Sequence, residues 1–307
     1  APAITRKVIV VDTTPPLISV LGEKALHLSV GSEYTDPGAS ATDGFEGELR
    51  VDDTTRIPVL GLVFHWSFDE MDGSLILDSS PNSLHGSLEG VDPVVAIIEG
   101  KDGQALSLNG SGAYVHLAHS DKIDPLEMTA SCWFRSEHDG DWYRNLFGKY
   151  GYSPGTPFWG LGWMGPRQLG FCVRDILNVR STAQADVGWG FDGEWHHLAG
   201  VRANGKIKFY GDGVLLSEVD DKTGDNRNDR PLSLGRHSNN YFPAQIDEVR
   251  LYDRGLPAAQ ISILHSGGGL DTSKAGEITV TYETFDSSGN TATVAADVCT
   301  LPWVSVS

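Results

Sequence analysis

The sequence predicts an all-β protein of about two domains. The chain has 307 residues, a length that suits two domains of ordinary size. Its apolar residues recur in many short alternating runs with little helical periodicity, which is the pattern of half-buried strands. The runs are separated by turns rich in Gly, Asn and Asp, and Ala203–Gly205 and Gly211–Gly213 favour tight hairpins. Many short antiparallel strands at this spacing are typical of sandwiches and jelly rolls.

Two segments at opposite ends of the chain are predicted to form one small β domain. The first contains DTTPP at residues 12–16 and YTDPGASATD at 34–43, and the second contains LDTSKAG at 270–276 and FDSSGNTA at 285–292. Taken together, these motifs resemble the immunoglobulin-like (Ig-like) repeats of large bacterial surface and secreted proteins, which act as spacers.

The resemblance implies how the two ends of the chain are organised. It implies a discontinuous Ig-like domain made of residues 14–55 and 270–300. Residues 1–13 are then expected to be the last strand of a preceding repeat plus a linker, and residues 301–307 a tail. We therefore expect a fragment of a longer protein whose partners include neighbouring repeats of the same chain.

The intervening residues 56–269 carry most of the predicted strands. Residues 62–68 alternate in burial tendency, with Phe64 and Trp66 on the apolar face. A short helix is predicted at 257–264, where Pro257 can occupy the first turn and Gly267 follows the end. Further strands are predicted at 103–109, 113–117, 128–135, 145–149, 158–163, 168–174, 194–202, 206–210, 231–234 and 244–252.

Six motifs follow one another in this middle segment. They are WSFDE at 66–70, DSS with N and HG at 78–86, ASCWF at 130–134, GEWHHLA at 193–199, YGDG at 210–213 and QIDEVRLYDRGL at 245–256. In this order they resemble laminin-G-like modules, which have the concanavalin A-like lectin jelly-roll fold. The resemblance covers nearly all of the segment, although the loop at 138–155 matches poorly.

The second resemblance implies a two-sheet sandwich whose first and last strands lie side by side. Such an arrangement brings the ends of the segment together, as insertion into a loop of another domain requires. We therefore predict a concanavalin A-like jelly-roll sandwich, residues 56–269, inserted into an Ig-like β-sandwich.

The charge balance excludes two classes of partner. Lys and Arg number 23 against 41 Asp and Glu, which gives a net charge of −18. Phosphate backbones need a basic surface, so we expect no nucleic-acid partner. Anionic membrane surfaces are disfavoured for the same reason, and no apolar run is long enough to predict membrane insertion. The acidity either serves solubility or supplies oxygen ligands for calcium.

Three cysteines, Cys132, Cys172 and Cys299, cannot form a fully paired set. Strand alternation places Cys132 on the apolar side of its strand, whereas Cys172 falls opposite Phe171 and Val173. We therefore expect three free thiols.

The resemblance to laminin-G-like modules implies a structural calcium ion near the first and last strands of the jelly roll. Asp247 falls on the same predicted strand face as Val249, so its carboxylate is expected to point towards the core, where it needs N–H donors or a cation. Asp78 and Asn82 supply side-chain oxygens in one loop, and Asp69 closes the strand before it. The proposed ligands are therefore Asp69, Asp78, Asn82 and Asp247.

Simpler interpretations of these acidic residues stay open. Asp78 and Asn82 are also the residues expected if the loop is held by side-chain to backbone hydrogen bonds alone. In the Ig-like halves, Asp36, Asp43 and Asp286 lie in turn motifs. A calcium ion at the Asp12 linker is a further alternative, by analogy with other tandem surface repeats.

Two segments offer the groups that bind sugars. Proteins bind sugars with aromatic rings flanked by planar amide, carboxylate and guanidinium groups. The candidate ligand-binding residues are Trp142, Tyr143, Arg144 and Asn145 in one loop, and Arg236, Asn239, Asn240 and Tyr241 in another. A loop that packs on itself would explain Trp142 and Tyr143 equally well, and Trp133 and Trp195 lie in framework motifs that favour packing.

No catalytic constellation is found in the sequence. A jelly-roll glycosidase needs two carboxylates flanking the scissile bond, and the E-x-D-x-E strand pattern that supplies them does not occur. His196 and His197 are neighbours on a predicted strand, so their rings should face opposite sides and cannot chelate one ion. We therefore expect no enzyme.

The sequence favours a non-catalytic ligand-binding module of a secreted or cell-surface bacterial protein. Carbohydrate is the expected ligand, and the Ig-like domain is expected to display the module. The alternatives are a module for adhesion to an extracellular protein and a purely architectural insert.

Overall fold

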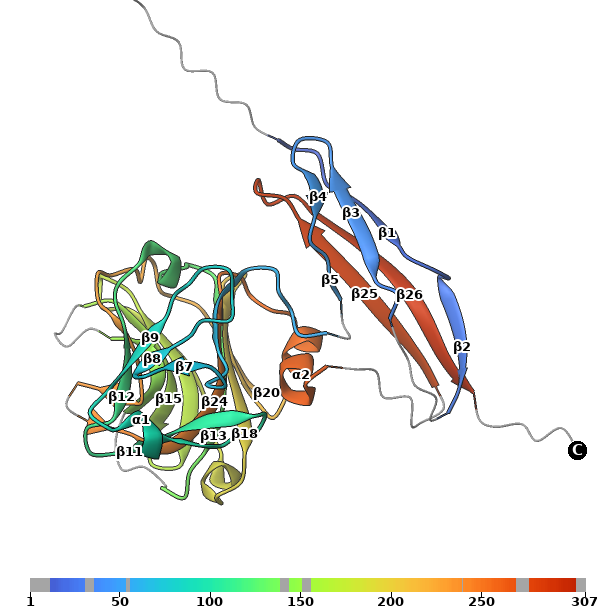
Figure 1. The fold of residues 1–307 in the computed structure, drawn as a ribbon. Coiled ribbons are helices and arrows are strands. Elements are labelled where there is room, and N and C mark those ends of the chain that lie inside the picture. The colour runs from blue at the N-terminus through green and yellow to red at the C-terminus, as the bar shows by residue number, and fades with distance from the viewer. Residues whose placement is uncertain are drawn as a thin grey trace, which may run out of the picture. The chain divides into compact units, whose positions relative to one another are not determined.

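The chain divides into two compact units, each of which is described by itself (Figure 1). The computed structural model describes residues 12–30, 36–53, 56–138, 144–150, 156–238, 240–268 and 276–301. One unit is Gly61–His265, and the other combines Ala1–Leu60 with Ser266–Ser307. The strand predicted before residue 12 and the tail after residue 301 lie outside the described residues.

Two large antiparallel sheets make up the unit Gly61–His265, which confirms the all-β jelly-roll class. The eight-stranded sheet has the order β10 (Ile97–Glu99), β11 (Gln104–Asn109), β24 (Pro243–Tyr252), β13 (Met128–Arg135), β18 (His196–Ala203), β19 (Lys206–Gly211) and β20 (Val214–Asp220), with β6 (Leu62–Trp66) also paired to β24. The nine-stranded sheet has the order β17 (Arg180–Asp186), β16 (Gln168–Arg174), β15 (Phe158–Gly165), β14 (Arg144–Lys149), β21 (Leu232–Leu234), β12 (Tyr114–Leu117), β9 (Gly86–Glu89), β8 (Leu75–Ile76) and β7 (Met71–Asp72).

One continuous apolar core draws residues from both sheets. Phe64 and Trp66 of β6 are fully buried and stack with ring centroids 4.5 Å apart. Phe147 of β14 in the other sheet meets Phe64 edge-on at 5.9 Å, a favoured geometry for aromatic pairs. The alternation predicted for residues 62–68 therefore reflects a strand that buries one face against the opposite sheet.

The first and last long strands of this unit lie side by side, as the resemblance implied. β6 pairs antiparallel with β24, with Phe64 opposite Leu251. The N–H of Asp253 donates to the carbonyl of Gly61 at 2.8 Å and closes the pair.

Small elements complete the unit. The helix α2 (Ala258–Ser266) ends just before Gly267, which has a φ of +80° and occupies the left-handed conformation common after helices. Among the described residues, no helix combines the length and the hydropathy of a membrane span. The remaining elements are α1 (Pro93–Ala96), α2 (Ala258–Ser266), the 3₁₀ turns Asp121–Ile123 and Gly188–Phe191, and the hairpin β22 (Arg236–His237) and β23 (Asn240–Tyr241).

The unit built from both chain ends contains two smaller sheets. One has the order β1 (Leu17–Val20), β3 (Ala39–Asp43) and β4 (Gly47–Leu49), and the other has the order β2 (Ala25–Ser29), β26 (Thr291–Leu301), β25 (Gly276–Phe285) and β5 (Asp52–Asp53). Val280, Tyr282, Ala296 and Val298 form its core. Tyr282 also donates its hydroxyl to the Asp36 carboxylate at 2.6 Å. The Ig-like assignment of this unit stays a prediction.

The expectation of free thiols is confirmed. Cys132 lies in the main core, where burial raises the pKa of its thiol far above the usual range. Cys172 lies on the opposite face of its sheet, beside Phe158 and Met164. The two strands belong to different sheets, and the thiols point to different environments.

Candidate functional site

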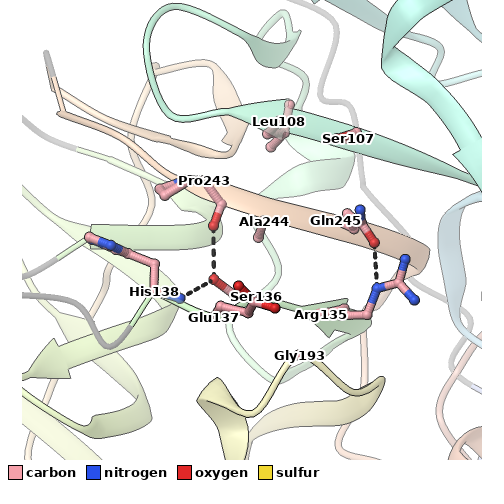
Figure 2. Close-up of a pocket in the computed structure, with 10 residues that line it drawn as sticks. All are labelled: Ser107, Leu108, Arg135, Ser136, Glu137, His138, Gly193, Pro243, Ala244 and Gln245. Carbon is pink, nitrogen blue, oxygen red and sulfur yellow. Dashed lines mark hydrogen bonds between the residues drawn. The ribbon is translucent and has the colours of Figure 1, made fainter.

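An open pocket of about 690 Å³ lies where β11, β13 and β24 run side by side in the eight-stranded sheet (Figure 2). Its volume is in the range of small-ligand sites. The lining residues are Ser107, Leu108, Arg135, Ser136, Glu137, His138, Gly193, Pro243, Ala244 and Gln245.

Strand register explains why polar side chains meet in this pocket. Gln245 pairs with Ser107 on one side and with Arg135 on the other, so the three side chains share one face. The neighbouring residues Phe134 and Ile246 are fully buried on the opposite, core face. Alternation therefore directs Ser107, Gln245 and Arg135 away from the core.

Arg135 is held in a defined orientation. Its Nε donates a hydrogen bond to the Gln245 side-chain carbonyl, and Figure 2 shows the two side chains reaching towards each other. The guanidinium also lies over the Trp195 ring, 5.1 Å from its centroid, within the range of a cation–π contact. A planar donor group is thereby presented at the pocket, and towards the residues that the structure describes its terminal amino groups make no hydrogen bond.

Ser136 fixes the floor of the pocket. Its hydroxyl donates to the carbonyl of Pro243 at 2.9 Å and accepts the N–H of His138 at 3.1 Å. Glu137 is exposed, and its carboxylate lies against Gly193, where an added Cβ would come within 3.2 Å of Oε1. The pocket therefore combines a fixed guanidinium, an amide and an accessible carboxylate.

An aromatic cluster on the hairpin β22–β23 brings together two of the predicted sugar-binding residues. The Arg236 guanidinium lies 4.5 Å from the centroid of Tyr114 and 5.7 Å from that of Tyr241. The two tyrosine rings are 6.0 Å apart, and Asn240 is exposed beside them. Tyr241 is separated from the pocket residue Pro243 by one residue, so the cluster and the pocket are close along the chain.

The other predicted sugar-binding residues are less informative. Trp142, Tyr143 and Asn239 lie outside the described residues, and Arg144 and Asn145 are placed only as members of β14. The pocket residues next to these positions were missed by sequence reasoning. Glu137 and His138 open the loop that leads to Trp142, whereas Gln245 lies in a framework motif that gave no separate signal.

The four predicted calcium ligands occupy two separate hydrogen-bonded sites. Asp78 accepts the N–H groups of His65, Ser80 and Leu84 and the Ser80 hydroxyl, at 2.8 to 2.9 Å. Asn82 donates from Nδ2 to the carbonyls of Leu62 and Val63. These bonds hold the turn after β8, as the simpler interpretation expects.

Asp69 and Asp247 both bind the loop at residues 100–104. Asp69 accepts the N–H of Gln104 at 2.7 Å, and Asp247 accepts those of Lys101 and Asp102 at 2.8 and 3.0 Å. The described residues contain no group of three metal-ligating side chains that includes Asp69, Asp78 or Asp247. The calcium ion predicted for the four residues stays a prediction.

The expectation that Asp247 shares a face with Val249 is wrong. Asp247 pairs with Trp133, while the preceding Ile246 pairs with Phe134 of the core. Glu248 has a φ of +54°, and the register with β13 shifts at this point. This β-bulge inserts one residue, so Asp247 and Val249 face opposite sides of the sheet.

Two buried ionisable groups flank Trp133 as a result. Asp247 is fully buried, and burial raises the pKa of its carboxyl to about 7. His197, paired with Trp133 on the other side, is 1% exposed, and burial lowers the pKa of its imidazole to about 3. Trp133 also stacks on His265 of α2 at 5.3 Å, so it is a packing residue, as expected.

His196 and His197 face opposite sides of β18, which confirms that prediction. His196 pairs with Phe134 and lies between Asp212 and Asp192, at 2.9 and 3.1 Å from its two ring nitrogens. His197 lies against Trp133. The two imidazoles therefore belong to separate environments.

The chain is similar in sequence to one protein superfamily. Residues 109–262 match the profile of the concanavalin A-like lectin/glucanases superfamily. This stretch includes Arg135, Glu137 and Gln245 of the pocket and the hairpin β22–β23. No curated protein shows significant sequence similarity to the chain.

Solved structures with the same fold include domains that bind sugars. Domain 4 of AbnA, an extracellular arabinanase from Geobacillus stearothermophilus solved with arabinotriose, is 25% identical with a TM-score of 0.51, and the match covers 66% of this chain and 98% of that domain. The ligand-binding domain of botulinum neurotoxin serotype D, solved with N-acetylneuraminic acid, is 12% identical with a TM-score of 0.55, over 67% of this chain and 51% of that one.

The binding domain of a Paraclostridial mosquitocidal protein is similar to the same degree. It is 16% identical with a TM-score of 0.55, and the match covers 67% of this chain and 52% of that one. The chain thus spans about half the length of the toxin domains that it matches. At these identities the likeness to the toxins shows a shared fold.

Proposed function

Because the chain belongs to the concanavalin A-like lectin/glucanases superfamily, we propose that residues 61–265 form a non-catalytic carbohydrate-binding module of a secreted or cell-surface bacterial protein. The glycan would occupy the pocket around Arg135 and Gln245. The second unit would serve as the spacer that displays the module.

The observation that carries this proposal is the fixed guanidinium of Arg135 in an open pocket. Gln245 and the Trp195 ring hold Arg135 on two sides, so little side-chain entropy remains to be lost when a ligand binds. Guanidinium, amide and carboxylate groups match the alternating donors and acceptors of sugar hydroxyls. Glu137 and Gln245 supply the acceptors beside Arg135.

The neighbouring aromatic residues support a ligand with apolar ring faces. Tyr114 and Tyr241 are half-buried, as expected for rings that keep one face accessible. A chain of several sugar units could contact both the pocket and this hairpin. The arabinotriose complex of the AbnA domain and the N-acetylneuraminic acid complex of the neurotoxin domain are consistent with a glycan ligand.

A glycan array followed by calorimetry on the full chain tests the proposal. Arg135→Ala and Gln245→Ala should each weaken binding of the array hit by about tenfold or more, equal to about 1.4 kcal/mol, without lowering the melting temperature. Arg230→Ala is the matched control, since Arg230 is an exposed arginine away from the pocket lining. A hit that binds both pocket variants with unchanged affinity would refute the proposed site.

A protein ligand is the second candidate function. Val214, Leu215 and Leu216 are 61, 44 and 37% exposed at the start of β20, the last strand in its sheet. Consecutive exposed apolar residues on an edge strand favour contact with another protein. In that case Leu215→Lys would abolish capture of the partner, and the glycan array would be blank.

A further inference from the structure

Three aspartates from distant parts of the sequence converge in the unit built from both chain ends. Asp12, Asp43 and Asp286 each offer a carboxylate oxygen, and these oxygens lie within 4.8 Å of one another. Asp12 precedes β1, Asp43 ends β3 and Asp286 follows β25. Asp43 and Asp286 are only 7 and 2% exposed.

Two oxygens of this cluster are buried without a hydrogen-bond donor. Oδ2 of Asp12 and Oδ2 of Asp43 have no partner among the described residues. The other oxygen of each carboxylate is engaged in its own turn. Asp12 Oδ1 accepts the N–H of Thr14 at 2.9 Å, and Asp43 Oδ1 accepts those of Phe45 and Glu46 at 2.6 and 3.0 Å. The turns therefore fix both side chains and leave one oxygen of each available.

No positive side chain balances the charge of the cluster among the described residues. Their Lys, Arg and His side chains form no ion pair with these three aspartates. The Asp286 carboxylate accepts hydrogen bonds from the backbone and the side chain of Asn290, and both donors are uncharged. Adjacent buried carboxylates repel each other strongly and need a cation or protons to coexist.

We propose that Asp12, Asp43 and Asp286 bind one calcium ion. All the side-chain ligand atoms are hard oxygens, at the end of β3 and in the segments next to β1 and β25. Such a set of oxygens suits the flexible coordination of calcium better than the strict octahedron of magnesium. Zinc would instead prefer His and Cys ligands. Asn290 orients two of the ligands, because its Nδ2 donates hydrogen bonds to Asp286 Oδ2 at 2.7 Å and to the Asp12 carbonyl at 3.2 Å.

The ion would join three segments that the backbone leaves separate. The turn after β3 and the turn after β25 are already linked by Ser287, whose N–H donates to Glu46 at 2.9 Å. Calcium would bind the Asp12 carboxylate to this pair of turns, in addition to the hydrogen bond that the Asp12 carbonyl already accepts from Asn290. The direction in which the chain approaches β1 would then depend on calcium.

Calcium titration of the full chain, followed by calorimetry and by terbium luminescence, tests this site. Asp12→Asn and Asp43→Asn are suitable variants, because the remaining side-chain oxygen can still accept the turn N–H groups while an amide replaces the free oxygen. Glu48→Gln is the matched control. It removes one charge from an exposed residue of the same unit, in β4.

We expect each aspartate variant to weaken calcium binding by about tenfold or more, and the double variant to lose one equivalent of bound calcium. Glu48→Gln should bind as the wild type does. The proposal fails if the wild type binds no calcium at millimolar concentration, or if all the proteins bind with equal stoichiometry and affinity. Any calcium bound within Gly61–His265 would be unaffected by these variants, so the two locations are distinguished.

Discussion

Buried carboxylates occur in both units of this chain, but their surroundings differ. Asp78 of the jelly roll is surrounded by four hydrogen-bond donors from the chain itself. Asp43 of the other unit has one oxygen bound by its own turn and one buried oxygen with no donor among the described residues. Burial alone therefore does not identify a metal ligand, and the atoms that face each oxygen decide between a structural carboxylate and a cation site.

The largest effect is expected at Asp78. Asp78→Ala should lower the free energy of unfolding by about 3–5 kcal/mol, because buried N–H groups lose a charged acceptor. Urea unfolding followed by tryptophan fluorescence measures this unit, since all tryptophans except Trp303 lie between residues 61 and 265. Asp72→Ala, at an exposed position, should change stability by less than about 0.5 kcal/mol. Equal losses in the two variants would contradict a structural role for Asp78.

Removal of calcium should affect the two units differently. At a calcium concentration about a hundredfold above the dissociation constant, binding stabilises the folded state by about 2.7 kcal/mol. Hydrogen exchange of β25 and β26 should accelerate in chelator, while the tryptophan-monitored unfolding of the jelly roll should not shift. A shift of the tryptophan transition would instead support a calcium ion bound within Gly61–His265.

The pH dependence of the jelly roll tests the opposed groups beside Trp133. The pKa of His197 is lowered from 6.5 to about 3 in the folded state. The unfolded chain therefore binds a proton at His197 before the folded protein does, and the free energy of unfolding falls as the pH drops from 6.5 towards 3. Asp247, whose pKa is raised to about 7, works in the opposite direction, since its folded form gains stability as pH falls below 7. The wild-type profile should therefore be nearly flat between pH 6.5 and 5.

His197→Phe removes one of the two opposed groups. Relative to the wild type, this variant should gain about 1.4 kcal/mol in free energy of unfolding for each pH unit below 6.5. Urea unfolding at pH 6.5 and pH 5 measures the difference. Parallel profiles for the two proteins would mean that His197 titrates normally.

The smallest effect is expected from Asp43→Asn in the presence of chelator. Without calcium, the neutral amide relieves repulsion among three carboxylates, so we expect a stabilisation of about 1 kcal/mol. Asp78→Asn should destabilise under the same conditions, because its amide nitrogen would face N–H donors. The two substitutions are isosteric, so effects of opposite sign on the free energy of unfolding would show the difference between the two carboxylates directly. A destabilising Asp43→Asn would contradict the expected repulsion among the three carboxylates.

Strands with a regular alternation of apolar and polar residues could be predicted from the sequence, but edge strands and β-bulges could not. The strand predicted at 128–135 is observed as Met128–Arg135, because Met128, Ala130, Cys132 and Phe134 alternate towards one core. β20 was missed since Val214, Leu215 and Leu216 are consecutive exposed residues on an edge strand. The face of Asp247 was predicted wrongly because a single bulge residue, Glu248, reverses the alternation after it.

The candidate sites depend on strand register and on contacts between distant segments, which a sequence does not give directly. Arg236 and Tyr241 could be predicted together because they lie in one short stretch of sequence, which folds as the hairpin β22–β23. Arg135 and Gln245 meet through the register of β13 with β24. The convergence of Asp12 with Asp286 requires both ends of the chain to fold into one unit.

The parallel pairing of β2 with β26 has a mechanical consequence. Ala25–Ser29 runs alongside Asp297–Leu301 in the same direction, so tension applied between Ala25 and Leu301 loads all the hydrogen bonds of the pair in shear at once. The antiparallel pair of β6 and β24 places Leu62 opposite Tyr252, so force applied across that end would open its bonds one after another. The unit formed by the two chain ends is therefore the part of the molecule suited to carry load.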